Sequence, residues 1–236
     1  MAQYLFPPAA PAVLRVVGET ALFPVWRVYC VGRNYRAHSQ EMIKRLAEQL
    51  NIKDDKLDAP PFFSQKPAYG AVTDSRTIPY PPKTQRLEHE LELVVALGDD
   101  AAVYGCALGV DLTRRDLQDQ AKAQRRPWDA TKVFDASAPV GALARSLPPP
   151  ATRLELRVNG LLRQSFVLAD MVYGVPEILD HLARELDLRR GDVIFTGTPA
   201  GVGVLAPGDA VACRAFAADG AEALPACEFV VGEARL

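Results

Sequence analysis

The sequence has few of the side chains that bind zinc or form disulfides. Of its 236 residues, only four are cysteine and three are histidine. The cysteines form no Cys-x-x-Cys pair and stand far apart, at Cys30, Cys106, Cys213 and Cys227. A chain of this length can fold without disulfides, so we expect free thiols and a cytoplasmic location. A zinc site would have to draw on the few histidines, which are His38, His89 and His181, and zinc is therefore disfavoured.

Long apolar runs and an excess of one charge are also absent. Apolar runs such as residues 93–97 fall far short of the roughly 20 residues that cross a bilayer, and the first residues lack the pattern of a signal peptide. The 27 basic and 29 acidic residues give a formal net charge of −2. We therefore expect neither a membrane nor a nucleic acid as a partner.

Nineteen prolines and sixteen glycines divide the chain into many short segments. Apolar and alternating patterns predict strands at residues 28–31, 61–64, 87–97, 103–110 and 191–196, and a hairpin at residues 154–165. Helical spacing predicts helices at residues 38–50, 113–125 and 175–188, the second with a capping box formed by Thr113 and Asp116. We expect an α+β fold, a mixed β-sheet roll with a few flanking helices, over residues 26–236. Residues 1–25 are predicted to form a Pro-rich arm with one short strand at residues 12–17.

Three acidic residues form a candidate metal site. Glu90 and Glu92 are two apart in a predicted strand, so both carboxylates project from one face. Asp111 ends the apolar strand at residues 103–110, a position where a rigid scaffold commonly presents a functional group. A solvated strand face is the alternative for the two glutamates. Three carboxylates without a nearby sulfur or imidazole ligand favour Mg²⁺ or Mn²⁺, with Ca²⁺ also possible.

His38 and Glu41 are candidates for a general-base pair. At a spacing of three on a helix, Glu41 can orient the imidazole and raise its basicity, which enables it to activate water. A simple surface contact is the alternative. The helix and the charged residues 51–60 that follow it predict a segment that closes over the pocket, with His38 and Glu41 at its start.

Lys132 stands between two aromatic residues in Trp-Asp-Ala-Thr-Lys-Val-Phe, residues 128–134. A lysine in apolar company usually keeps its ammonium at the surface, and a cation in a binding pocket is the alternative. The glycine-rich residues 197–203 lack the Gly-Lys-Ser/Thr ending of a phosphate-binding loop, and Pro199 removes an amide donor. A nucleotide site is therefore rejected.

The chain resembles the fumarylacetoacetate hydrolase family, in particular its compact acylpyruvase branch, through an ordered series of motifs. These are Tyr-Cys-Val-Gly-Arg-Asn-Tyr at residues 29–35 followed by His38 and Glu41, Phe-Phe-Ser-Gln-Lys-Pro at 62–67, His-Glu-Leu-Glu-Leu at 89–93, Gly-Val-Asp-Leu-Thr-Arg-Arg-Asp-Leu-Gln at 109–118, Lys-Val-Phe at 132–134 and Thr-Gly-Thr-Pro-Ala-Gly-Val-Gly at 196–203. The resemblance extends from about residue 27 to about residue 209.

This resemblance implies a β-roll fold, a homodimer and one divalent ion in each subunit. It assigns the metal ligands to Glu90, Glu92 and Asp111, and the water-activating pair to His38 and Glu41. Lys132 becomes the pocket cation. The substrate-contacting residues become Lys66, Arg115, Gln118 and Thr198.

The implied activity is hydrolysis of a carbon–carbon bond in an acylpyruvate, a 2,4-dioxo acid. Fumarylpyruvate, which would give pyruvate and fumarate, is the preferred substrate. Oxaloacetate decarboxylation and keto–enol tautomerisation are the enzymatic alternatives, because oxaloacetate presents the same chelating head. A metal-stabilised binding protein is the non-enzymatic alternative, but such a protein has no use for a base beside the metal.

Overall fold

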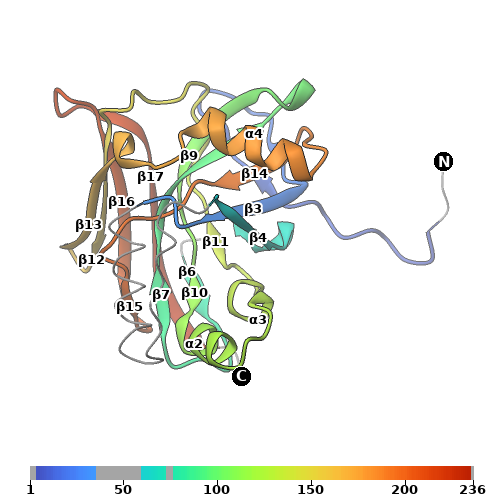
Figure 1. Cartoon of the computed structure of the whole chain (residues 1–236), viewed down its shortest axis with the longest axis vertical. Coiled ribbons are helices and arrows are strands. Elements are labelled where there is room, and N and C mark those ends of the chain that lie inside the picture. The colour runs from blue at the N-terminus through green and yellow to red at the C-terminus, as the bar shows by residue number, and fades with distance from the viewer. Residues whose placement is uncertain (1–3, 36–59, 73–76, 235–236) are drawn as a thin grey trace.

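The fold is built around two five-stranded mixed sheets (Figure 1). The structure, a computed structural model, describes residues 4–35, 60–72 and 77–234. The central sheet has the order β4-β3-β14-β8-β9, formed by Phe62–Lys66, Arg27–Gly32, Asp192–Phe195, Leu91–Leu97 and Val103–Val110. The outer sheet has the order β13-β12-β16-β17-β6, formed by Leu161–Val167, Arg153–Val158, Ala210–Phe216, Glu222–Ala234 and Thr77–Tyr80. Only β3–β14 and β6–β17 pair in parallel within these sheets.

Short strands and helices complete the described part of the chain. A three-stranded sheet joins β10, β7 and β15, which are Thr113–Arg114, Leu87–His89 and Gly203–Leu205. Two-stranded pairs join β1 to β2, Val13–Leu14 and Phe23–Pro24, and β5 to β11, Ala71–Val72 and Ala138–Pro139. The α-helices are α2, α3 and α4, which are Arg115–Ala123, Asp129–Lys132 and Val175–Glu185. Single 3₁₀ turns occur at Ala68–Gly70, Asp99–Ala101 and Leu168–Asp170.

The central sheet is buried on both faces, which explains why β8 is apolar except for Glu92. One face packs against the outer sheet and α4 in a large apolar cluster that includes Leu93, Leu156 and Leu182. The other face packs against the segments that carry β1, β2, β5 and β11, in a second cluster that includes Val94 and Leu14. Residues 12–25 therefore contribute to a core, and the predicted boundary near residue 25 stays a prediction. No helix in the described ranges is both long enough and apolar enough to cross a bilayer.

The expected α+β fold with mixed sheets is confirmed, and two local predictions are corrected. The predicted strand at residues 87–97 is two strands, β7 and β8, with Glu90 in the break between them. The predicted capping box is wrong, because α2 begins after Arg114 without a side-chain cap. The Thr113 hydroxyl instead donates to the Asp111 carbonyl at 3.2 Å and accepts a 2.7 Å hydrogen bond from Lys132 Nζ. The predicted helix at residues 38–50 lies outside the described residues.

Candidate metal centre

The three acidic residues converge at one end of the central sheet. Glu92 lies in β8, Glu90 in the break before it, and Asp111 directly after β9. Pairing of β8 with β9 places Asp111 beside Glu90, whose carbonyl accepts a 2.8 Å hydrogen bond from the Asp111 N–H. One carboxylate oxygen from each residue lies within 4.8 Å of the other two, and all three residues are buried. The carboxylates therefore face one small volume. The sequence pattern predicted Glu90 within a strand, whereas the structure places it in the break between β7 and β8.

Two buried lysines neutralise part of this negative charge. Lys132 Nζ, at the end of α3, lies 3.0 Å from Glu90 Oε2 and 2.7 Å from Asp111 Oδ2. Lys66 Nζ, from β4, lies 2.8 Å from Asp111 Oδ1. Burial alone lowers the pKa of Lys132, but the carboxylates of Asp111 and Glu90 outweigh burial and raise that pKa above its ordinary value. Lys132 is therefore a buried, charged group, and the alternative of a surface ammonium is wrong.

A buried arginine contacts Glu90 on the side away from Lys132. Arg115, in the first turn of α2, contacts Glu90 through Nη2 and donates from Nε to Glu88 Oε2 at 2.7 Å. Its Nη1 donates to Gln118 Oε1 at 2.5 Å. Lys122 Nζ donates to the same amide oxygen at 3.0 Å, so the oxygen of Gln118 is directed toward two cations. Burial raises the pKa of Glu88, but Arg115 and Arg86 outweigh burial and lower that pKa overall.

Glu92 has different surroundings from Glu90 and Asp111. Its Oε2 accepts a 2.6 Å hydrogen bond from the Gly197 N–H, at the start of the glycine-rich loop. Within residues 4–35, 60–72 and 77–234, no lysine or arginine forms an ion pair with Glu92. Burial, followed by the charges of Asp111 and Glu90, raises the pKa of Glu92 well above its ordinary value. Glu92 is therefore the member of the cluster whose charged form is least favoured in the metal-free protein.

This donor set fits a hard divalent cation. Glu90, Glu92 and Asp111 would supply carboxylate oxygens, the ligands that Mg²⁺, Mn²⁺ and Ca²⁺ prefer. A cation at this position would also offset the burial and the repulsion that together raise the pKa of Glu92. Cys30 lies close enough to feel the charge of Asp111, but burial and that charge raise its pKa well above the ordinary value, so it stays a neutral thiol. The surroundings thus favour an oxygen-binding metal over a thiolate-binding one.

The glycine-rich loop brings a threonine against the strand that carries Glu92. The Thr198 hydroxyl donates to the Leu91 carbonyl at 2.8 Å and accepts a 2.9 Å hydrogen bond from Gln164 Nε2. Because the hydroxyl has a single proton, Thr198 has no side-chain donor left for a substrate. The structure thus places Thr198 beside the carboxylates but directs its side chain to the protein itself.

Most of the residues expected in the site lie together, and His38 and Glu41 lie outside the described residues. Sequence reasoning missed three contributors: Thr113, Gln164 and Gly197. Thr113 accepts a 2.7 Å hydrogen bond from Lys132 Nζ, a role that its use as a presumed cap had hidden. Gln164 is a buried polar residue in a strand whose other residues are mostly exposed. The alternation of the predicted hairpin could have indicated that this polar side chain points inward.

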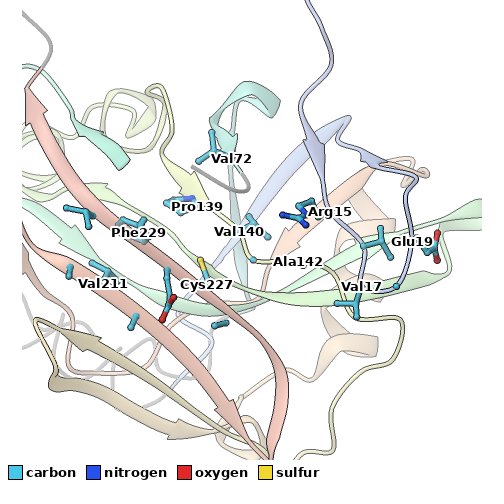
Figure 2. Close-up of a pocket in the computed structure, with 18 of the residues that line it drawn as sticks. Arg15, Val17, Glu19, Val72, Pro139, Val140, Ala142, Val211, Cys227 and Phe229 are labelled. Carbon is cyan, nitrogen blue, oxygen red and sulfur yellow. The ribbon is translucent and has the colours of Figure 1, made fainter. Parts of the chain in front are cut away.

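Two cavities help to delimit the site. A cavity of about 690 Å³ is lined by Lys132 together with Phe62, Gln65 and Trp128, so it adjoins the carboxylate cluster. A second cavity of about 1090 Å³ lies elsewhere, between the segment after β1, the β11 region and strands β16 and β17 (Figure 2). Its lining is mainly apolar and contains none of the metal-site residues, so it is not the catalytic pocket.

Comparison with known proteins identifies the protein family to which this chain belongs. The C-terminal domain family of fumarylacetoacetate hydrolase matches residues 27–231. The chain therefore belongs to the fumarylacetoacetate hydrolase family, a family of enzymes, and has its fold.

The chain is similar both to fumarylpyruvate hydrolases and to oxaloacetate tautomerases. One solved structure is that of fumarylpyruvate hydrolase from Pseudomonas aeruginosa in complex with Mn²⁺ and pyruvate. It is 36% identical in sequence and has a TM-score of 0.87, and the match covers 98% of this chain and 100% of the hydrolase chain. A candidate fumarylpyruvate hydrolase from Burkholderia cenocepacia is 45% identical, covers 100% and 97%, and has a TM-score of 0.84. The mitochondrial oxaloacetate tautomerase FAHD1 of Homo sapiens is 36% identical over 197 residues, 78% of this chain and 84% of its own.

Proposed function

We propose that this chain is a Mg²⁺- or Mn²⁺-dependent hydrolase that cleaves fumarylpyruvate, or a closely similar acylpyruvate, to pyruvate and a carboxylic acid. The observation that carries the proposal is the buried triad of Glu90, Glu92 and Asp111, with Lys132 between two of its members. Likeness over nearly the whole chain to a fumarylpyruvate hydrolase with Mn²⁺ and pyruvate supports it. We also expect a homodimer and a cytoplasmic location, as the sequence predicted.

The bound cation would act as a Lewis acid on the 2-oxo acid head of the substrate. The surrounding cations, Lys66, Arg115 and Lys132, provide positive charge for the same anionic head, and Gln118 lies beside Arg115 to assist in orientation. Lys132 keeps its proton at neutral pH, so it is suited to stabilise an oxyanion that develops during attack.

The remaining chemistry is assigned to His38 and Glu41. Glu41 orients His38, which accepts a proton from water, and the resulting hydroxide attacks the C4 carbonyl of the acylpyruvate. The bond between C3 and C4 then breaks, and its electron pair leaves with the pyruvate fragment, which is protonated at C3. The acyl fragment departs as the carboxylic acid, which is fumarate when the acyl group is fumaryl.

Oxaloacetate tautomerisation is the second candidate, favoured by the identity of 36% to human FAHD1. Oxaloacetate carries the same 2-oxo acid head, and moving its C3 proton needs no attacking water. Decarboxylation of oxaloacetate is a further variant that likewise needs none. Membership in an enzyme family disfavours a protein that only binds metal.

One set of assays separates these activities. Purified protein is freed of metal with EDTA, reloaded with Mg²⁺ or Mn²⁺, and supplied in turn with fumarylpyruvate, acetylpyruvate and oxaloacetate. Loss of dioxo-acid absorbance with release of pyruvate and fumarate, only when metal is present, supports the hydrolase. Rapid keto–enol interconversion of oxaloacetate without cleavage of either acylpyruvate would refute it in favour of the tautomerase.

A further inference from the structure

The residue between the two metal-site glutamates lies at a change of strand partner. Strand β14 pairs with β8 as far as Phe195 and Val94, and the Thr196 N–H extends this pairing to the Leu93 carbonyl. On the same side, β15 pairs with β7 from Gly203 and His89 onward. Leu91 lies between these two pairings, where the glycine-rich loop leaves the sheet. Its main-chain groups on this side therefore need partners other than a neighbouring strand.

Two side chains take the place of the missing strand. Gln164 Oε1, from β13 in the outer sheet, accepts a 3.0 Å hydrogen bond from the Leu91 N–H. The Thr198 hydroxyl donates to the Leu91 carbonyl at 2.8 Å, and Gln164 Nε2 donates to that hydroxyl at 2.9 Å. Leu91, Gln164 and Thr198 are at most 4% exposed, so no bulk water competes for these bonds. Both main-chain groups of Leu91 are thus held by one connected set of side chains.

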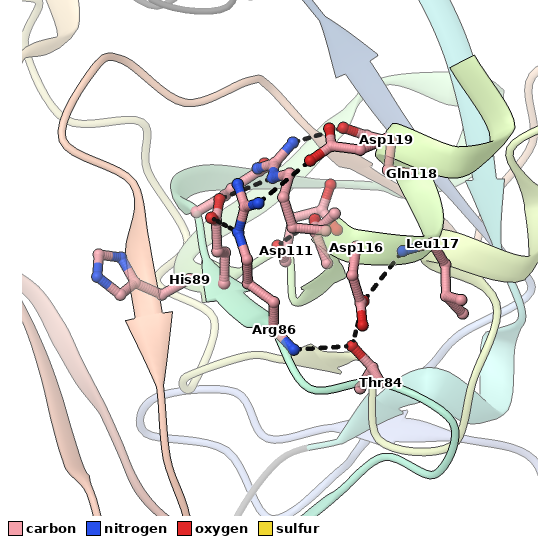
Figure 3. A network of polar contacts seen from close by, with 12 residues as sticks. Thr84, Arg86, His89, Asp111, Asp116, Leu117, Gln118 and Asp119 are labelled. Atoms are coloured by element: carbon pink, nitrogen blue, oxygen red, sulfur yellow. Dashed lines mark hydrogen bonds and ion pairs between the residues drawn. The ribbon is translucent and has the colours of Figure 1, made fainter. Parts of the chain in front are cut away.

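The direction of every bond in this set is fixed. The Leu91 N–H can only donate, so the atom of Gln164 that it meets must be the amide oxygen. That oxygen also lies 3.0 Å from His89 Nδ1, and because it only accepts, Nδ1 must carry the hydrogen. His89 is 1% exposed and extends away from the Arg115 network (Figure 3), so its imidazole serves the amide and not the carboxylates.

We infer that Gln164 is a positioning residue for the metal-binding carboxylates, acting through Leu91, with His89 and Thr198 holding its amide. Glu90 and Glu92 are joined through Leu91, so a rotation of this residue changes the separation of their carboxylates. Like charges in a buried cluster push the carboxylates apart, and bonds to both main-chain groups of Leu91 oppose that displacement. This inference rests on the proposed metal site but assigns a role to residues outside the proposed ligand set.

Metal affinity of the substrate-free protein tests the role directly. Gln164→Leu keeps the size of the side chain and removes its bonds to Leu91 and Thr198. We expect the Mn²⁺ dissociation constant, measured by titration with electron paramagnetic resonance detection, to rise about 10- to 100-fold, as is usual when a residue supporting a ligand is lost. Leu156→Ala is the matched control, because Leu156 pairs with Gln164 across β12 and β13 and is part of the core. It should lower the melting temperature and leave Mn²⁺ affinity within about twofold of the wild type.

Equal Mn²⁺ affinity in Gln164→Leu and the wild type would overturn the inference, and so would equal weakening in both variants. Thr198→Val, which removes only the hydroxyl bonds, provides the same test if Gln164→Leu does not fold. A second measurement needs no variant: nitrogen-15 chemical shifts should show a hydrogen on Nδ1 of His89. An imidazole with its hydrogen on Nε2 alone would contradict the assigned network. A wild type that binds Mn²⁺ but cleaves no acylpyruvate would refute only the proposed function, whereas one that binds no Mn²⁺ would refute both.

Discussion

At the scale of single residues, the three carboxylates of the metal site are not equivalent. Glu90 lies between Arg115 and Lys132, and Asp111 lies between Lys66 and Lys132. Glu92 is held by a main-chain N–H, and its pKa is raised by burial and by the other two carboxylates. Within the described residues, Glu90 and Asp111 therefore have cationic partners in ion pairs, whereas Glu92 has a main-chain donor.

This asymmetry predicts that Glu92→Gln stabilises the metal-free protein. Between the ordinary pKa of 4.5 and the raised pKa in the folded state, the folded protein binds more protons at Glu92 than the unfolded chain does. The unfolding free energy of the wild type therefore falls as the pH rises through this window, and the full penalty is present above it. We expect Glu92→Gln to lack this fall and to be more stable than the wild type at pH 7 by on the order of 1–3 kcal/mol.

Urea denaturation of the EDTA-treated proteins from pH 4 to pH 8 measures the effect. Glu90→Gln is the matched comparison, because it removes a partner from Arg115 and Lys132 and should destabilise the same metal-free protein by on the order of 2 kcal/mol. If both substitutions changed stability in the same direction, the charge asymmetry described here would be wrong.

The proposed metal site predicts a loss of activity when any one of its three carboxylates is removed. Glu90→Ala, Glu92→Ala and Asp111→Ala should each abolish metal-dependent turnover, because three carboxylates leave little redundancy for holding the ion. Calorimetric titration with Mn²⁺ and assays with Mg²⁺ check this. Full metal affinity and turnover in any one variant would remove that residue from the ligand set.

At the scale of secondary-structure elements, the start of the glycine-rich loop connects the sheet to the site. Gly197 directly follows Thr196, whose main-chain N–H bonds to the Leu93 carbonyl of β8, and its φ of +98° is one that side-chain-bearing residues rarely adopt. A Cβ at this position would lie 2.8 Å from the Cβ of Asn34. Asn34 cannot move aside easily, because its buried amide donates to the Tyr173 and Thr196 carbonyls and accepts from the Tyr173 N–H. The Gly197 N–H that binds Glu92 is therefore fixed by its surroundings.

Gly197→Ala is accordingly expected to damage both stability and the site. The strained backbone should cost on the order of 1–3 kcal/mol in unfolding free energy, and displacement of the N–H from Glu92 should weaken Mn²⁺ binding. Gly208→Ala is the control, since Gly208 also has a positive φ but a Cβ there meets nothing within 4 Å. A loss of stability should then occur in both variants, with a loss of Mn²⁺ affinity in Gly197→Ala alone.

The same elements explain what the sequence could predict. Strands with a strong pattern were located well, such as the hairpin whose turn residues Asn159 and Gly160 both have positive φ. The break at Glu90 was missed, because the change of partner from β14 to β15 depends on strands more than 100 residues away in the chain. The local pattern singled out the three acidic residues that lie together in the fold. The contacts of Gln164 required knowledge of which hairpin lies beside Leu91.

At the scale of the whole molecule, the two proposed reactions differ in what they require besides the acidic cluster. Relatives of this chain are named as a fumarylpyruvate hydrolase and as oxaloacetate tautomerases, at identities of 35–36%. Both proposed substrates, an acylpyruvate and oxaloacetate, carry a 2-oxo acid head. Only hydrolysis needs an activated water, so the base that prepares this water should separate the two reactions within one protein.

His38→Ala tests this separation. General-base loss should lower kcat for cleavage of fumarylpyruvate by on the order of 10²- to 10⁴-fold. Oxaloacetate decarboxylation should fall far less, because it requires the ion and a positioned substrate but no attacking water. Both reactions are measured in the same Mn²⁺-loaded preparation, and Mn²⁺ affinity serves as the control that the triad remains intact. Equal losses in the two reactions would remove the water-activating role from His38 and leave it a residue for binding or folding. A selective loss of hydrolysis would assign the attacking water to His38, and it would identify the carboxylate and cation cluster alone as sufficient for the reaction on oxaloacetate.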